Sequence, residues 1–236
     1  MTELEPYEAQ SATIDLPSIE AAAQLTRSRS RSRVTSRPGK LPLPPGPESP
    51  AGSPSILTRL NSNDASQRAA ALQALAQIGD DDAYVMITDG FDDQAPEVRN
   101  AAARALYNLH PDYMFSFSEA VRDASGERHR RIAGAVADSG LAREAIANLA
   151  QDDCDGAYRA FSLLWHMAVG GEVQCLIQSI EEDLPAVVRI TIVELLALSG
   201  RSEAIPALRR LAVRRSLSSE LRSALMQAIH QLQQNY

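Results

Sequence analysis

The residue types that catalyse reactions or bind metals are present, but their spacing matches no catalytic or metal-binding pattern. The chain has four histidines: His110, His129, His166 and His230. They are followed by Pro, Arg, Met and Gln, so none begins the HExxH pattern of zinc proteases. No GxSxG nucleophile motif and no glycine-rich phosphate loop occurs in the sequence. We therefore predict no catalytic residue, no metal ligand and no cofactor, and we expect that the protein is not an enzyme.

Two smaller groups of residues have structural explanations. Cys154 and Cys175 form no CxxC unit, so they predict neither a disulfide framework nor a zinc site. Asp152, Asp153 and Asp155 are similar to the start of a calcium-binding loop, but the supporting glycine and the distal glutamate are missing. We interpret these acids as part of a capped, solvent-exposed turn.

Arginine recurs at regular positions, each time just before an alanine-rich or apolar run. The recurring residues are Arg68, Arg99, Arg130, Arg159, Arg189 and Arg222, at intervals of 29 to 33 residues. Three acids, Asp93, Asp153 and Asp183, each precede one of these arginines by six residues. In a stack of repeats, each acid would lie near the arginine of the neighbouring repeat. We predict a structural ladder of charge-assisted hydrogen bonds; the alternative is a row of anion-binding groups.

The sequence around these arginines has the apolar spacing of α-helices. Val98, Ala101, Ala102, Ala105 and Leu109 follow the i, i+3, i+4, i+7 rule and share one helical face. Side chains able to cap helix N-termini precede several of the runs: Asp64, Asp155 and Ser218. Glycines suited to left-handed C-terminal caps close several of them: Gly79, Gly140, Gly170 and Gly200. Each unit is therefore predicted to be a helix, a tight turn and a second helix.

The repetition of this unit predicts an all-α fold. We expect an α-solenoid of six helical hairpins, with a short opening helix in the first, over residues 54–79, 80–110, 111–140, 141–170, 171–200 and 201–236. A single hairpin cannot bury its apolar stripe alone, whereas stacked neighbours can. No stretch alternates apolar and polar residues for long, which argues against strands.

The repeated motif resembles that of a known family. Val98-Arg99-x-x-Ala102 and Val188-Arg189, with the repeat length and the closing glycine, resemble HEAT repeats, in particular the short HEAT-like repeats associated with phycobilisome bilin lyases. The third repeat departs from the pattern, because His129-Arg130-Arg131-Ile132 replaces Val-Arg-x-Ala. The resemblance implies the solenoid fold more strongly than any one function, since such repeats serve unrelated roles.

Residues 1–53 differ in composition from the rest, so we predict a disordered tail joined to a repeat domain at residues 54–236. Residues 41–50 are too rich in proline for a helix or a central strand. Residues 27–40 contain six positive charges, including an alternating Arg/Ser run at residues 27–33 whose serines could accept phosphate. Four alternatives stay open for this basic stretch: binding to RNA, to an anionic membrane surface or to the acidic repeat domain, or the role of a solvated linker.

The charge and hydropathy of the chain exclude some classes of protein. Residues 54–236 contain 17 positive and 24 negative charges, which account for the net charge of −7 and argue against general nucleic-acid binding. No stretch approaches the roughly 18 apolar residues of a membrane-spanning helix. The N-terminal residues show no secretory signal. We expect a cytoplasmic protein without a transmembrane segment.

We expect the second helices of the hairpins to line a concave surface. Apolar residues of the fourth and fifth repeats would face solvent together there, beside polar residues of the second and third. The predicted partner-binding residues are Asn100, Arg104, Tyr107, Arg131, Ala160, Leu164, Met167, Ile190 and Glu194. The alternative is that tighter curvature or a rotated helix buries these residues.

The sequence thus predicts a non-catalytic scaffold or adaptor that binds an unidentified protein partner through this surface. The resemblance to lyase-type repeats implies an alternative, a bilin lyase or a bilin-handling protein. A further alternative is weak nucleic-acid binding through residues 27–40.

Overall fold

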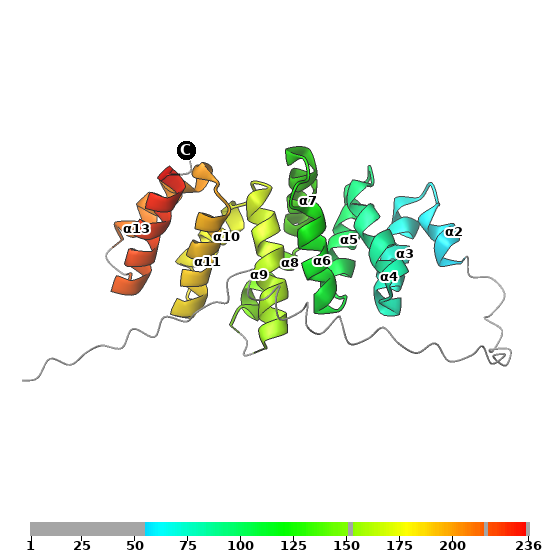
Figure 1. Cartoon of the computed structure of the whole chain (residues 1–236), viewed down its shortest axis with the longest axis horizontal. Coiled ribbons are helices and arrows are strands. Elements are labelled where there is room, and N and C mark those ends of the chain that lie inside the picture. Colours follow the sequence, from blue (N-terminus) through cyan, green and yellow to red (C-terminus); the bar gives the residue numbers. More distant parts are fainter. Residues whose placement is uncertain (1–54, 151–152, 215–216, 235–236) are drawn as a thin grey trace, which may run out of the picture. The chain divides into compact units, whose positions relative to one another are not determined.

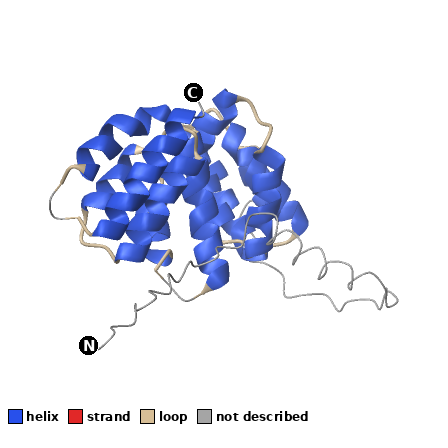
Figure 2. Ribbon diagram, turned by 60° about the vertical axis from the view of Figure 1, so that its left-hand side comes forward, coloured by secondary structure: helices blue, strands red, loops and turns tan. Residues whose placement is uncertain are grey.

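The computed structural model describes residues 55–150, 153–214 and 217–234, and the predicted tail at residues 1–53 lies outside them. Within the described residues the secondary structure consists of helices and no strand (Figures 1 and 2). No described helix is long and apolar enough to cross a membrane. The prediction of an all-α fold is therefore confirmed.

Twelve α-helices form six consecutive hairpins in the described part of the chain. The pairs are α2 (Ile56–Leu60) with α3 (Ala65–Ile78), α4 (Asp81–Asp89) with α5 (Pro96–Tyr107), α6 (Pro111–Val121) with α7 (Gly126–Asp138), α8 (Leu141–Asn148) with α9 (Cys154–Val169), α10 (Gln174–Glu181) with α11 (Ala186–Leu198), and α12 (Ile205–Ala212) with α13 (Ser219–Gln234). Two short 3-10 helices, Gly90–Asp92 and Ser202–Ala204, lie between them. These hairpins coincide with the six predicted repeats, and the first helix is short, as expected.

Local side chains determine where the helices begin and end. Asp64 caps α3 by accepting from the Ser66 N–H at 2.9 Å. Asp153, rather than the predicted Asp155, caps α9, because its carboxylate accepts from two backbone N–H groups in the first turn. Gly79 ends α3 in the left-handed conformation, with φ of 67°, as predicted. Gly170 has φ of −76°, so the left-handed cap expected there is wrong.

One hydrophobic core runs through all six hairpins. Its members come from every hairpin, although α2 itself has no buried residue. The largest fully buried side chains include Phe91, Phe117 and Met114, which come from the second and third hairpins. Each hairpin thus buries its apolar side against its neighbours, as stacked repeats require.

The second helices of the first three hairpins run parallel to one another. Arg104, in the last turn of α5, donates to the backbone carbonyl of Ser139, which caps the C-terminus of α7. The C-terminal ends of α5 and α7 therefore lie together. Helices α2–α7 form a regular stack, which we call the N-terminal segment.

The direction changes at α9. Gly170, at the C-terminus of α9, packs on His129 and Ala133, which belong to the N-terminal half of α7. Helix α9 therefore runs antiparallel to α7. It runs parallel to α6, because Arg159 near its start binds the carbonyl of Leu109 and His166 further along binds Ser118. In consequence, α9 packs against both helices of the third hairpin and does not extend the row α3, α5, α7 (Figure 1).

Beyond this junction the stack is regular again. Arg201, which follows α11, donates through Nε to the carbonyl of Val169 at the C-terminus of α9, at 2.7 Å. The C-terminal ends of α9 and α11 therefore lie together, and these helices are parallel. Helices α8–α13 form the second stack, which we call the C-terminal segment.

Candidate functional site

The predicted arginine–aspartate ladder is present at one position. Arg68 of the first hairpin donates from Nε to Asp93 Oδ2 at 2.8 Å and from Nη2 to Asp93 Oδ1 at 2.9 Å. The same guanidinium donates to the carbonyl of Ser62 at 2.9 Å. These hydrogen bonds from Arg68 lower the pKa of Asp93 below its usual value. This bidentate ion pair joins the first two hairpins.

Most of the other recurring arginines bind backbone carbonyls rather than acids. Two of them bind the turn that precedes their own helix, Arg99 at Asp93 and Gln94 and Arg222 at Arg214, and Arg189 binds Ile180 in the last turn of α10. Arg159 donates instead to the carbonyls of Tyr107 and Leu109, and its guanidinium carbon lies 5.6 Å from the centre of the Tyr107 ring. The recurring arginine therefore serves mainly to satisfy turn carbonyls, which explains why its spacing follows the repeat.

The remaining members of the predicted ladder do not pair. Within the described residues, no hydrogen bond or ion pair joins Asp153 or Asp183 to an arginine. Asp153 is occupied as the cap of α9. Arg130 is exposed and makes no hydrogen bond or ion pair with another described residue. The continuous ladder predicted from spacing is thus wrong. The reversal at α9 separates Asp153 from Arg130, and Arg159 donates to the carbonyls of Tyr107 and Leu109 instead of pairing with Asp183.

Four of the predicted partner-binding residues are buried. Ala160, Leu164 and Met167 are fully buried, and Tyr107 is 4% exposed. The expectation that they face solvent is wrong, because α9 is packed against α6, α7, α8 and α11 at once. The hydroxyl of Tyr107 accepts from the side-chain amide of Asn148 at 2.7 Å, which fixes its ring inside the fold.

The other predicted partner-binding residues reach solvent, but on two different segments. Arg104 and Arg131 are exposed and Asn100 is partly exposed, all on α5 and α7. Glu194 is exposed and Ile190 partly exposed, both on α11. Although Glu194 reaches solvent, partial desolvation of its carboxyl raises the pKa above its usual value. The residues that remain accessible therefore belong to the separate rows α5–α7 and α11–α13.

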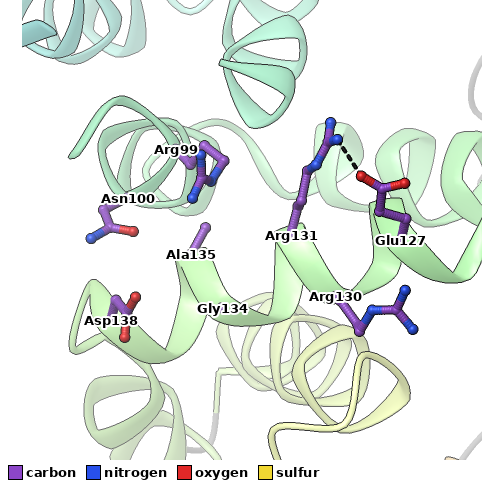
Figure 3. Close-up of a pocket in the computed structure, with 8 residues that line it drawn as sticks. All are labelled: Arg99, Asn100, Glu127, Arg130, Arg131, Gly134, Ala135 and Asp138. Carbon is purple, nitrogen blue, oxygen red and sulfur yellow. Dashed lines mark hydrogen bonds and ion pairs between the residues drawn. The ribbon is translucent and has the colours of Figure 1, made fainter. Parts of the chain in front are cut away.

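An open cleft of about 310 Å³ lies between α5 and α7. Its lining residues are Arg99, Asn100, Glu127, Arg130, Arg131, Gly134, Ala135 and Asp138. Figure 3 shows Asn100 and Asp138 at one end, Glu127 and Arg131 at the other, and Gly134 and Ala135 between them. Two of the predicted partner-binding residues, Asn100 and Arg131, thus line the same depression of the surface, at its two ends.

The arginine-rich start of α7 gives this cleft its charge. Arg131 pairs with Glu127 at 2.5 Å and approaches Asp92 at 3.7 Å. Arg128 also pairs with Asp92, at 3.3 Å. Arg130 lies between these two residues in sequence and has no such partner among the described residues. One end of the cleft is therefore rich in positive charge that acids of the protein only partly balance.

Sequence reasoning missed the floor of the cleft. Gly134 lies inside α7, and a Cβ added there would meet no atom within 4 Å. Glycine inside a helix costs stability, so it usually has a local steric reason, and Gly134 has none. The glycine inside an alanine-rich helix was the sequence signal that could have indicated this open floor.

A second groove lies between α11 and α13 in the C-terminal segment, with a volume of about 270 Å³. Its walls are mainly alanine and glutamine, with Glu194 and the half-exposed Leu198 at its edge. No group of three or more His, Cys, Asp or Glu residues in the described part of the chain is arranged to hold a metal ion.

Comparison with known families agrees with this architecture. Residues 53–137 match the family model of HEAT repeats. This part of the chain consists of HEAT repeats. It covers α2 to α7, and it ends where the direction of the second helices reverses at the next hairpin. No curated protein matches the chain.

Solved structures of several repeat proteins are similar to it. An archaeal HEAT-like repeat protein from Thermococcus onnurineus NA1 has 13% identity and a TM-score of 0.27, with 76% of this chain and 86% of that chain covered. A designed armadillo repeat protein in complex with the peptide (KR)4 has 17% identity and a TM-score of 0.29, with 75% and 98% covered. Another designed armadillo repeat protein has 18% identity and a TM-score of 0.30, with 75% and 98% covered.

Proposed function

We propose that this protein is a non-catalytic scaffold that binds a partner protein over the exposed face of α5 and α7. The observation that supports this proposal best is the cleft between the two helices, which Asn100 and Arg131 line at its two ends. A concave, partly polar surface on a rigid stack of helices suits the docking of a polypeptide segment. Two unpaired cysteines suit a reducing compartment, so we seek the partner in the cytoplasm.

The cleft lies on rigid elements. Helices α5 and α7 contact each other along their length and bury seven and five residues, respectively. A surface built on packed helices keeps its shape on binding better than a surface built on loops. Docking there therefore has little ordering cost on the side of the scaffold.

Affinity capture from a native cytoplasmic extract tests this proposal. Immobilised full-length protein is compared with the Arg131→Glu variant, which reverses a charge at the cleft. The matched control is Arg209→Glu, at an exposed position of α12. We expect one or more proteins to co-purify with the wild type and the control and to be depleted with Arg131→Glu. Identical sets of proteins from all three samples would contradict the proposal.

The two alternatives from the sequence stay predictions. Nucleic-acid binding through residues 27–40 concerns residues outside the described part of the chain. The bilin alternative still rests on the resemblance of the repeats alone.

A further inference from the structure

We propose that the cleft between α5 and α7 binds a carboxylate-bearing segment of the partner, with Arg130 as the group that binds an acid and Arg99 as a second positive charge on α5. This inference rests on the proposed function and names the chemistry of the ligand at the same site.

Arg130 supplies an uncompensated positive charge at the cleft. It is exposed, and it forms no ion pair with a described acid. Its neighbours in sequence, Arg128 and Arg131, already bind Asp92 and Glu127. A guanidinium with five donors and no internal acceptor is available for a bidentate contact with a carboxylate.

Arg99 supplies a second such charge from α5, where Figure 3 shows it beside Ala135 and apart from Arg130. Its Nη1 donates to the carbonyls of Asp93 and Gln94, which orient the guanidinium but do not neutralise it. Both carboxylate oxygens of Asp93 are engaged by Arg68. Arg99 is thus positioned by the turn of its own hairpin while its charge stays available to a ligand.

The direction of the helices adds to the positive electrostatic potential at the cleft. Helices α5 and α7 are parallel, and Arg99 and Arg130 both lie within the first turns of their helices. The N-terminal end of a helix has a partial positive charge, so arginines there are not stabilised by the helix dipole. A bound carboxylate would reduce the unfavourable interaction between the positive end of a helix dipole and the arginine beside it.

The opposite end of the cleft has a different polarity. Asp138 and Asn100 lie there, away from Glu127 and Arg131 (Figure 3). A ligand with an acid at one end and a hydrogen-bond donor, such as a backbone N–H, at the other would match this gradient. No side chain covers the backbone of α7 at Gly134, so a ligand side chain can approach this backbone closely.

The charges also distinguish an acidic peptide from a nucleic acid. Residues 54–236 have a net charge of −7, and Glu127 and Asp138 line the cleft itself. The negative charge around the cleft would repel an extended polyanion, whereas one or two carboxylates on a peptide would contact only the positive end of the cleft. The observations therefore favour a peptide.

Fluorescence anisotropy with the full chain tests the inference. The probe is a short labelled peptide with three consecutive glutamates, and its matched control has glutamines instead. We expect the glutamate peptide to bind the wild type, and Arg130→Gln to weaken this binding by about tenfold, the effect of losing one charge-assisted contact. Arg209→Gln, which removes an exposed arginine from α12, should leave the affinity within about twofold.

Gly134→Leu provides a second, independent variant. The added Cβ meets no atom of the protein, and the rest of the leucine should extend into the cleft, so we expect the fold to persist while the glutamate peptide is excluded. Circular dichroism confirms that the variant is folded. Equal affinity of the wild type for the two peptides, or unchanged binding by Arg130→Gln and Gly134→Leu, overturns the inference.

Two further outcomes also overturn it. The first is tighter binding of a single-stranded RNA oligonucleotide that is lost in Arg130→Gln, which would make the cleft a polyanion site. The second is absence of glutamate-peptide binding although Gly134→Leu depletes the captured partner. In that case the scaffold function stands and only the ligand chemistry is wrong.

Discussion

Gly170, at the end of α9, packs directly on the backbone carbonyl of His129 in α7. This contact between the end of one second helix and the start of the previous one shows that the stack changes direction between the third and fourth hairpins. The reversal places α9 beside both α6 and α7 and divides the exposed helical faces into two rows. The cleft between α5 and α7 belongs to the first row, and the groove between α11 and α13 belongs to the second.

The Gly170 contact predicts a large stability loss on substitution. A Cβ at this position would overlap Ala133 and the His129 carbonyl, both held by the helix α7. We expect Gly170→Ala to lower the free energy of unfolding by about 3 kcal/mol, measured by urea denaturation, because the two helices must separate. A change smaller than about 0.5 kcal/mol would show that the helices do not meet here.

Gly134→Ala should have the opposite effect and is the matched control. Gly134 lies inside α7, and Gly170 has a right-handed helical backbone conformation at the end of α9. In contrast to Gly170, a methyl group added at Gly134 meets no atom. We expect the free energy of unfolding to rise by about 0.5 to 1 kcal/mol, since alanine loses less backbone entropy in a helix. Destabilisation would mean that the floor of the cleft is filled by some part of the protein.

The pair Arg68–Asp93 should couple the first two hairpins. Each of the single variants Arg68→Gln and Asp93→Asn should lower the free energy of unfolding. In a double-mutant cycle, we expect the sum of these two losses to exceed the loss in the double variant. The folded pKa of Asp93 is depressed, so its contribution exists above the unfolded pKa and disappears as the pH falls through the folded value. The difference between wild type and Asp93→Asn should therefore shrink at acidic pH, and a difference independent of pH contradicts the ion pair.

His166 should make the protein sensitive to acid. Its ring is buried against Phe117, and its Nε2 lies 2.9 Å from Ser118 Oγ. Burial, with a smaller effect of His129, lowers its pKa from 6.5 to about 4. Below about pH 6.5 the unfolded chain takes up the proton first, so stability should fall until about pH 4, by roughly 3 kcal/mol in total.

The control for this effect is His166→Gln, which keeps a partner for Ser118 but does not titrate. We expect this variant to be less stable at neutral pH and to have a flatter dependence of the urea midpoint on pH. The same slope in both proteins would mean that groups other than His166 cause the acid sensitivity.

The hairpins were predictable from the sequence because each depends on local patterns. The spacing of Val98, Ala101, Ala102 and Ala105 gave the buried face of α5, and all four are buried. Asp64 capped α3 as its side chain predicted. Such features involve residues within a few turns of one another, so the order of neighbouring repeats does not affect them.

The burial of α9 was given from the sequence only as the alternative to an exposed surface, although the composition of the helix indicated it. After Arg159 this helix is apolar nearly all round, with Phe161 and Trp165 beside Leu164, and such helices lie in the interior. The repeat spacing suggested instead an exposed row. The reversal itself was not predictable, because it depends on how α8 directs the chain after α7, and the repeat length is nearly unchanged there.

The cleft was predictable in part. The departure of the third repeat at Arg130 and Arg131 was visible in the sequence, and Asn100 was placed on the correct face. The open floor at Gly134 and the lack of a partner for Arg130 follow from the packing of α7 against α5 and α9, which the sequence alone does not give.

Photo-crosslinking from inside the cleft tests the central claim most directly. A benzophenone amino acid replaces Asp138 at the cleft in one full-length variant, and Gln178 on the exposed side of α10 in the other. After irradiation in native extract, the account predicts a crosslinked partner only from position 138, and excess wild-type protein should compete it away. Crosslinks from position 178 alone, or the same crosslinks from both positions, would contradict docking at the α5–α7 cleft.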